Sequence, residues 1–479
     1  MSGSSLKDKT RRGLFWTFVN QFATYGVQFV IGIFMARQLS PSDYGITALP
    51  AVFMAVAAVF IDSGFAQAMI RKPELKEEDL STSFYYSLLV GLICYIIIYF
   101  SSSWIAEFYK EPILEQLIHV TALIFFISPL TTPQTIILQR KLDFRTPTII
   151  NVLCIFIQGF IGLSLAYTGW GIWALVLSGL AKSIANCFLC WLAVRWRPKT
   201  GWCKESFKYL WGFGNKMVGS KLLDRLYINI VPVFVGKYFS PADLGVYNRA
   251  EKYAMLPSQN LSGVIQQVTF PVLSKVQNDN EKLRYGYRTL IRTTAFIIFP
   301  IMTLLSALSK PLIILMITEK WIDCVPLLQI MCWTMMWYPI HSLNLNVLMV
   351  RGRSDLFLRL EIIKKIFGIC MLAICLPKGL IVVCIGSFVS SMFSLIINTH
   401  YTGKIIGVGY FMQLMDIIPT IVLCIISFIS AYCCTCFFEN SLQQVLYGGF
   451  IGTTLYIVLA YVFKFNQLKE IKYMFSKNV

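Results

Sequence analysis

The sequence predicts an all-α polytopic membrane protein with about fourteen transmembrane helices, arranged as two pseudo-symmetric six-helix lobes and a C-terminal helix pair. Of the 479 residues, 56% are hydrophobic and only 14% are charged, and the mean hydropathy is +0.65. A soluble globule cannot bury that share of apolar surface, so the chain belongs in a bilayer. A Ser-Pro-x-Asp-x-Gly motif at 40–45 recurs at 240–245, which predicts that the chain was built by doubling.

A stretch of about 20 apolar residues is long enough to cross the hydrocarbon core. Each predicted span is such a stretch, bounded by polar or charged connections. In chain order, the spans are 13–36, 44–70, 82–105, 113–137, 146–167, 170–194, 210–236, 243–272, 287–309, 325–349, 357–376, 379–402, 412–436 and 443–463. The seventh and eighth of these carry several charges.

The connections alternate in charge, and cytoplasmic loops collect Lys and Arg. Most of the 42 basic residues fall on the side of the N-terminus, for example in 71–76, 195–208 and 351–365. Both termini are therefore predicted to be cytoplasmic. Residues 1–12 are short, polar and basic, and the apolar run after them is too long for a cleaved signal, so we expect it to be the first anchor. The net charge of +18 is spread over short loops, which disfavours nucleic-acid binding.

Alignment of the two copies defines three parts of the chain. Residues 1–204 form an N-terminal six-helix lobe, 205–405 form a C-terminal six-helix lobe, and 406–479 hold two additional transmembrane helices and a cytoplasmic tail. Because each repeat has an even number of helices, both copies share one orientation and their symmetry axis follows the membrane normal. Within each motif, Ser40 or Asp43 is expected to cap the next helix, and Gly45 to allow close approach.

Two segments, 35–45 (MARQLSPSDYG) and 138–145 (LQRKLDFR), carry a resemblance to a known family. They resemble the polysaccharide-transporter branch, the lipid-linked oligosaccharide flippases, of the multidrug/oligosaccharidyl-lipid/polysaccharide exporter (MOP) superfamily. The resemblance covers the whole chain. It implies translocation of undecaprenyl-diphosphate-linked oligosaccharide repeat units across the bacterial inner membrane by alternating access, for capsule, exopolysaccharide or O-antigen synthesis.

The same resemblance implies the lipid-linked oligosaccharide and membrane lipids as partners, together with downstream polymerase and export proteins. No phosphate-binding loop of the Gly-x-x-x-x-Gly-Lys-Ser/Thr type occurs, and no cofactor is expected. Two other functions stay open. A drug/cation antiporter of the same superfamily would lack a cationic lobe, and a membrane-embedded polysaccharide polymerase or ligase would carry a long external loop, which is not seen.

Charges inside the predicted spans suggest where a substrate binds, because an ionised group in the membrane is costly and normally faces a wet cavity. They concentrate in the second repeat, where Lys221, Asp224 and Arg225 stand against the polar Gln21, Thr24 and Tyr25 of the first. The predicted substrate-binding residues are Lys221, Arg225, Arg249, Lys252 and Arg292, and the predicted coupling residues are Asp62 and Asp224.

Spacing supports a shared surface for two pairs of these cations. Lys221 and Arg225 have i, i+4 spacing, and Arg249 and Lys252 have i, i+3 spacing, so each pair is expected on one helix side. They would line a hydrated cavity and attract the diphosphate. In the alternative interpretation, Asp224 and Glu251 neutralise these cations in structural helix pairs.

Arg292 lies near the cytoplasmic end of its span, where snorkelling also accounts for its charge. Asp62 is the lone acid of the second span and is followed by Ser63, Gly64 and Gln67. We expect Asp62 to take up a proton or Na⁺ during transport; a carboxylate hydrogen-bonded to neighbouring polar groups is the alternative. Proton, Na⁺, membrane potential and product removal all remain candidate driving forces.

Overall fold

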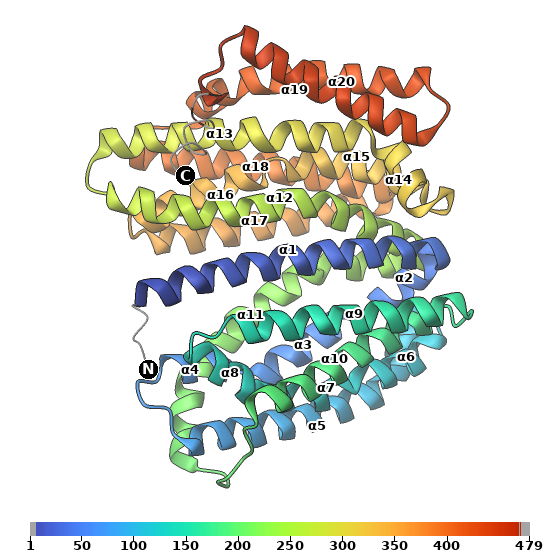
Figure 1. Ribbon diagram of the computed structural model, residues 1–479, viewed down its shortest axis with the longest axis vertical. Coiled ribbons are helices and arrows are strands. Elements are labelled where there is room, and N and C mark those ends of the chain that lie inside the picture. Colours follow the sequence, from blue (N-terminus) through green and yellow to red (C-terminus); the bar gives the residue numbers. More distant parts are fainter. Residues whose placement is uncertain (1–5, 469, 471–479) are drawn as a thin grey trace. The chain divides into compact units, whose positions relative to one another are not determined.

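The computed structural model describes residues 6–468 and 470, and the regular structure in that part of the chain is helical. Contacts divide it into two compact units, Met1–Gly245 and Val246–Val479, which we call unit 1 and unit 2 (Figure 1). The N-terminus and most of the predicted cytoplasmic tail lie outside the described residues.

Unit 1 contains the helices of the first repeat and the helix that follows. They are α1 (Leu6–Gln38), α2 (Pro41–Ala48), α3 (Ala51–Asp62), α4 (Phe65–Arg71), α5 (Glu77–Tyr109), α6 (Ile113–Ala122), α7 (Ile124–Ile127), the 3-10 helix η1 (Ser128–Thr131), α8 (Thr132–Arg140), α9 (Arg145–Tyr167), α10 (Trp173–Val194) and α11 (Lys204–Tyr238). Two predicted spans are thus interrupted, since α2, α3 and α4 form one and α6 to α8 form another.

Unit 2 contains most of α12 and all later helices. They are α12 (Pro241–Lys275), α13 (Asn280–Ala307), α14 (Ser309–Ile317), η2 (Glu319–Trp321), α15 (Cys324–Met335), α16 (Tyr338–Val350), α17 (Ser354–Cys375), η3 (Leu376–Lys378), α18 (Leu380–Ile406), α19 (Tyr410–Phe437) and α20 (Ser441–Val462). Within the described residues, 10 helical stretches are long and apolar enough to cross a membrane. Each coincides with a predicted span, and the chain is an all-α polytopic membrane protein.

Four further predicted spans are helical but fall outside these ten. They are the segments 210–236 in α11, 243–272 in α12, 325–349 in α15 and α16, and 357–376 in α17. Charges interrupt the apolar run in α11, α12 and α17.

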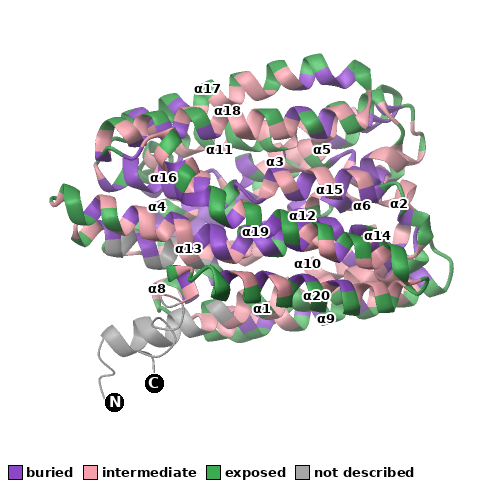
Figure 2. Ribbon diagram, turned by 90° about the horizontal axis from the view of Figure 1, so that it is seen from above, coloured by how far each residue is buried: buried purple, intermediate pink, exposed green. Residues whose placement is uncertain are grey.

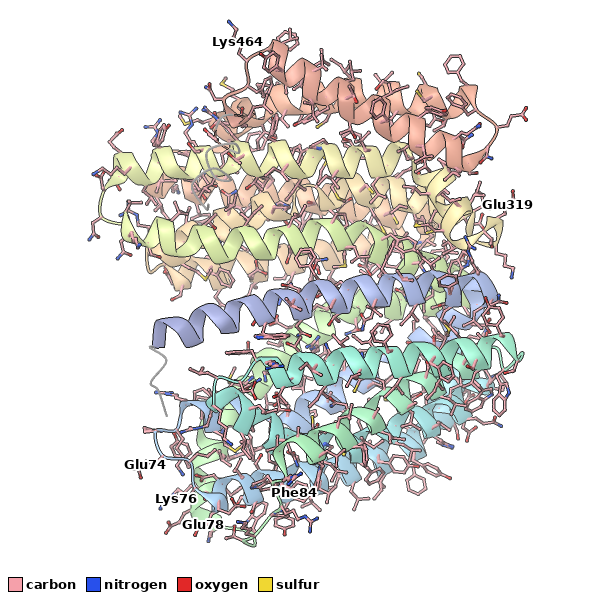
Figure 3. The ribbon with its side chains drawn as sticks, in the orientation of Figure 1. Glu74, Lys76, Glu78, Phe84, Glu319 and Lys464 are labelled. Atoms are coloured by element: carbon pink, nitrogen blue, oxygen red, sulfur yellow. The ribbon has the colours of Figure 1, made fainter. Side chains whose placement is uncertain are left out.

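The long helices carry many exposed residues, drawn green in Figure 2, and large apolar side chains are among them. Phe100 and Trp104 of α5 are 74% and 75% exposed, and Phe437 at the end of α19 is 82% exposed. Such surfaces suit hydrocarbon and not water. Charged groups gather at helix ends: Figure 3 labels Glu74 and Lys76 in the connection from α4 to α5 and Glu78 in the first turn of α5. This distribution agrees with a bilayer-spanning protein.

The two copies of the repeated turn have the same local structure and touch each other within unit 1. The Asp43 amide donates to Ser40 Oγ over 3.2 Å, and the Ser40 amide donates to Asp43 Oδ2 over 2.8 Å. Ser240 and Asp243 repeat this reciprocal cap, with both distances 3.1 Å. The predicted capping is confirmed, and it explains why both helices begin at the proline.

The glycines of the two turns face each other. A Cβ placed on Gly45 would lie 1.6 Å from the Pro241 carbonyl oxygen, and one on Gly245 would lie 1.9 Å from that of Pro41. No side chain fits at either position, so the predicted close approach is confirmed.

Packing assigns α11 to unit 1, although the repeat places residues 205–405 in the second lobe. The helix packs against α3, α4 and α5. Leu210 of α11 is fully buried in a core cluster with Phe65, Met69 and Phe84. The repeat shows which segments of the two halves correspond in sequence, whereas the contacts show which helices pack together. For α11 the two differ: it belongs to the second repeat by sequence and to unit 1 by packing.

Candidate substrate and coupling site

Lys221 of α11 forms an ion pair with Asp62, the last residue of α3. Lys221 Nζ contacts Asp62 Oδ2 and also donates to Gln67 Oε1 over 3.4 Å. The side chains are 28% and 38% exposed, so the pair is accessible to a ligand or an ion. The structure thus joins a predicted substrate-binding cation to a predicted coupling acid. This contact was not foreseen from the sequence.

The pair lies where a spanning helix is interrupted. Ser63 and Gly64, which follow Asp62, have positive φ values of 43° and 68° and end α3. Backbone carbonyls freed by such a break need new donors inside a membrane. Ser87 Oγ donates to the Ile61 carbonyl over 3.1 Å, and Ser63 Oγ donates to that of Phe60.

A glycine of α11 allows the two helices to approach at this break. A Cβ on Gly214 would lie 2.2 Å from the Ser63 carbonyl oxygen. Lys221, two turns further along α11, therefore reaches Asp62 because Gly214 brings the backbones together. The Asp62-Ser63-Gly64 sequence was the available signal for the break, since consecutive Asp, Ser and Gly favour turns over helix.

The other predicted residues of α11 have different surroundings. Arg225 and Asp224 are both exposed. The Arg225 guanidinium forms no ion pair with any residue that the structure describes. An exposed, unpaired cation this far along the helix is available to an anionic ligand.

Arg249 and Lys252, the predicted pair on α12, lie in different environments. Arg249 is only 5% exposed, and its guanidinium carbon lies 5.1 Å from the centre of the Trp321 ring and 5.6 Å from that of Tyr253. Lys252 is exposed. The two cations thus differ in exposure, because aromatic packing inside unit 2 encloses Arg249 and leaves Lys252 open; that both line one hydrated surface stays a prediction.

Arg292 is held by an acid of the appended helix pair. Its Nε donates to Asp416 Oδ1 over 2.9 Å, and Arg288 donates to both carboxylate oxygens over 2.7 Å. The Asp416 side chain is 3% exposed, and the contact ties α13 to α19. This ion pair accounts for the Arg292 charge. Asp416, an isolated acid in an apolar span, was the signal that sequence reasoning missed.

At the polar positions of the first repeat, Thr24 belongs to a small hydrogen-bonded cluster. Asn151 Nδ2 donates to Asn20 Oδ1 over 3.0 Å and to Thr24 Oγ1 over 2.9 Å. The cluster joins α1 to α9 and contains no charge. The first repeat is thus polar where the second carries Lys221 and Arg225, as the sequence comparison indicated.

A family of polysaccharide biosynthesis proteins matches residues 34–326, which is more than half of the chain and includes both repeated turns. The chain belongs to this family. The predicted membership of a polysaccharide biosynthesis family is confirmed.

Several relatives of the chain are also proteins of polysaccharide biosynthesis. The chain is 25% identical over 355 residues to the teichuronic acid biosynthesis protein TuaB of Bacillus subtilis, covering 74% of this chain and 73% of the relative. It is 23% identical to the lipopolysaccharide biosynthesis protein WzxC of Escherichia coli, covering 82% and 80%. The succinoglycan biosynthesis transport protein ExoT of Rhizobium meliloti is 21% identical, covering 67% and 65%.

Solved structures share the fold. The lipid II flippase MurJ, in an inward closed conformation, superposes with a TM-score of 0.77 at 18% identity, covering 93% of this chain and 98% of that one. An inward-facing multidrug resistance transporter of the MOP superfamily gives 0.61 at 14% identity, covering 82% and 98%. The family and the shared fold together show a multi-pass membrane protein of polysaccharide biosynthesis. Among the proteins it resembles, ExoT is a transport protein and MurJ is a flippase, and neither is an enzyme.

Proposed function

We propose that this protein is a flippase for undecaprenyl-diphosphate-linked oligosaccharide repeat units in the bacterial inner membrane. The products would feed capsule, exopolysaccharide or O-antigen synthesis. The observation that carries the proposal is the accessible Lys221–Asp62 ion pair beside a broken helix, in a chain of the polysaccharide biosynthesis family. A diphosphate is an acceptor that can replace a carboxylate on a lysine.

The transport cycle follows from that exchange. The diphosphate displaces Asp62 from Lys221, and exposed Arg225 adds positive charge on the same helix. Lys252 of unit 2 is a further exposed candidate for binding the substrate. Asp62, once released, is free to bind a proton or Na⁺, which is the coupling role that we assign to it; Asp224, exposed one residue before Arg225, is the second candidate. Arg249 and Arg292 keep the structural contacts described above.

The proposed architecture is that of the two repeats. Fourteen spans form two six-helix lobes, 1–204 and 205–405, and an appended pair, with both termini in the cytoplasm. The lobes rock to expose the head group to either side while the lipid tail stays in the bilayer. Downstream polymerase and export proteins receive the product.

Deletion of the gene tests the function directly. A flippase defect leaves undecaprenyl-linked repeat units in the cytoplasmic leaflet, and the wild-type gene restores export. If deletion causes no such accumulation, the chain does not perform this step. The drug/cation antiporter alternative, which the superfamily fold keeps in view, instead predicts altered sensitivity to cationic drugs with unchanged glycan export.

A further inference from the structure

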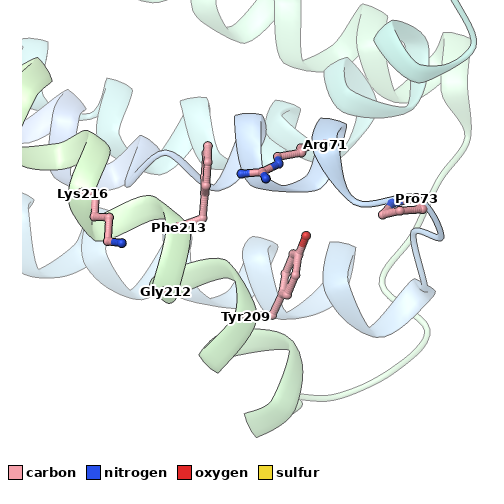
Figure 4. Close-up of a pocket in the computed structure, with 6 residues that line it drawn as sticks. All are labelled: Arg71, Pro73, Tyr209, Gly212, Phe213 and Lys216. Atoms are coloured by element: carbon pink, nitrogen blue, oxygen red, sulfur yellow. The ribbon is translucent and has the colours of Figure 1, made fainter.

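A groove with a volume of about 510 Å³ lies between the end of α4 and the first half of α11, entirely within unit 1 (Figure 4). Its volume is in the range of small-molecule sites. The lining residues are Arg71, Pro73, Tyr209, Gly212, Phe213 and Lys216. None of them is acidic.

Two cations reach the groove from different helices, Arg71 from α4 and Lys216 from α11. Both are exposed, and neither forms an ion pair with any described residue. The Arg71 guanidinium carbon lies 5.4 Å from the centre of the Phe213 ring. The nearby Lys72, in contrast, is paired at 2.7 Å with the buried Asp79. The groove therefore keeps two positive charges that no ion pair with a described residue neutralises.

The walls of the groove are held in place by contacts behind it. Arg140 donates to the carbonyls of Met69, Lys72 and Pro73, which fixes the loop after α4. Phe213 packs against the core cluster that contains Phe65 and Leu210. A ligand would thus meet a preformed surface, which lowers the entropic cost of binding.

Gly212 leaves the groove open along α11. A Cβ on this residue would meet no atom within 4 Å. A larger side chain at 212 would fill the groove without disturbing the packing around it, so the position provides a steric test.

The groove lies near the N-terminal end of α11. Residues 209–216 are about 8 to 18 Å from the start of α11, at the end that the charge pattern predicts to be cytoplasmic. Tyr209 and Lys216, which both line the groove, are of the aromatic and basic side-chain types that mark a membrane interface. Lys221 lies about 8 Å further along the helix axis.

We propose that this groove binds the diphosphate of a polyprenyl-linked glycan at the cytoplasmic surface, before the head group reaches Lys221. Two cations from two helices match two adjacent phosphates better than the single phosphate of a bulk phospholipid. This inference rests on the proposed function and adds an arrival site to it.

Undecaprenyl diphosphate is a suitable probe, because it carries the anionic group without a particular glycan. Its binding is measured on the purified full-length protein in phosphatidylcholine nanodiscs, for the wild type and for Arg71→Glu, Lys216→Glu and Gly212→Leu. Each variant should bind about tenfold more weakly, since a charge-assisted contact is worth at least that factor. Unchanged binding in all three overturns the proposal.

Matched controls separate the groove from general effects. Lys208→Glu reverses an exposed charge on α11 outside the lining, and Gly179→Leu adds bulk on α10 where a Cβ also meets no atom within 4 Å. Both should bind like the wild type. If Arg71→Glu fails to fold, Lys216→Gln and Gly212→Leu decide the matter, because both sites are exposed on a helix surface.

Two further results distinguish the sources of phosphate and the two proposals. Equal competition by phosphatidylglycerol or undecaprenyl monophosphate would show a general phosphate-lipid site and overturn the assignment to the diphosphate. Normal glycan export together with unchanged probe binding in the variants would reject the groove alone. Absence of lipid-linked intermediate after gene deletion would reject the flippase function instead.

Discussion

Lys221 and Asp62 form an ion pair between α11 and the last residue of α3, directly before the left-handed Ser63 and Gly64. The pair is partly exposed, so its contribution to stability is small, about 0 to 1 kcal/mol. Its position at a helix break and its access to ligands favour a role in transport over a role in folding. The two roles lead to different expectations for substitution.

We expect Asp62→Asn to lower glycan export about tenfold, because the carboxylate proposed for coupling is lost. The unfolding temperature should change little, because a partly exposed ion pair contributes little to stability. Accumulation of lipid-linked repeat units in the cytoplasmic leaflet measures the defect. The double variant Asp62→Lys with Lys221→Asp restores the attraction. Recovery of export in that variant would assign the pair a purely structural role.

Arg225→Ala and Lys252→Ala should each reduce export several-fold, because the exposed cations no longer attract the diphosphate. Folding should be unaffected at exposed positions, as judged by expression and gel filtration. Lys208→Ala, also exposed on α11, serves as the control. Normal export by both variants would remove these residues from the substrate path.

Asp416→Ala should destabilise the protein by about 2 to 3 kcal/mol, because a buried carboxylate that accepts from two guanidinium groups is lost. Thermal unfolding in detergent measures the change. Asp355→Ala breaks an exposed pair with Arg353 and should have little effect. If Asp416→Ala unfolds like the wild type, α19 is held to α13 by apolar packing alone.

Gly45→Ala and Gly245→Ala should each destabilise by about 1 to 3 kcal/mol or prevent folding, since the added methyl group meets a backbone carbonyl that cannot move away cheaply. Gly26→Ala on α1, where a Cβ meets no atom within 4 Å, should be neutral or slightly stabilising. Wild-type stability of both turn variants would mean that the turns separate in solution.

Much of the fold could be predicted because the hydropathy of a single segment is enough to predict a membrane helix. Apolar runs such as Glu77–Tyr109 and Arg145–Tyr167 coincide with predicted spans, and the Ser-Pro-x-Asp-x-Gly motif specified both helix caps and the close approach of Gly45. These features depend on residues within one turn or one helix. Hydropathy and capping chemistry act at that range.

The partners of the charged residues could not be predicted in the same way. Spacing on α12 suggested a shared surface for Arg249 and Lys252, but packing against Trp321 enclosed one and left the other exposed. Arg292 pairs with Asp416 on α19, more than a hundred residues away in the sequence. The spacing along a helix predicts which side chains lie on the same side of it, whereas the neighbouring helices determine what surrounds that side.

By itself, the sequence determined the membrane class, the two copies of the Ser-Pro-x-Asp-x-Gly turn and the concentration of cations in the second half of the chain. Only the tertiary structure decided that Lys221 meets Asp62, that Asp416 holds Arg292 and that α11 packs into unit 1. The physical reason is the range of the forces. Transfer of a helix into lipid depends on its own composition, but an ion pair depends on where a second helix places the opposite charge.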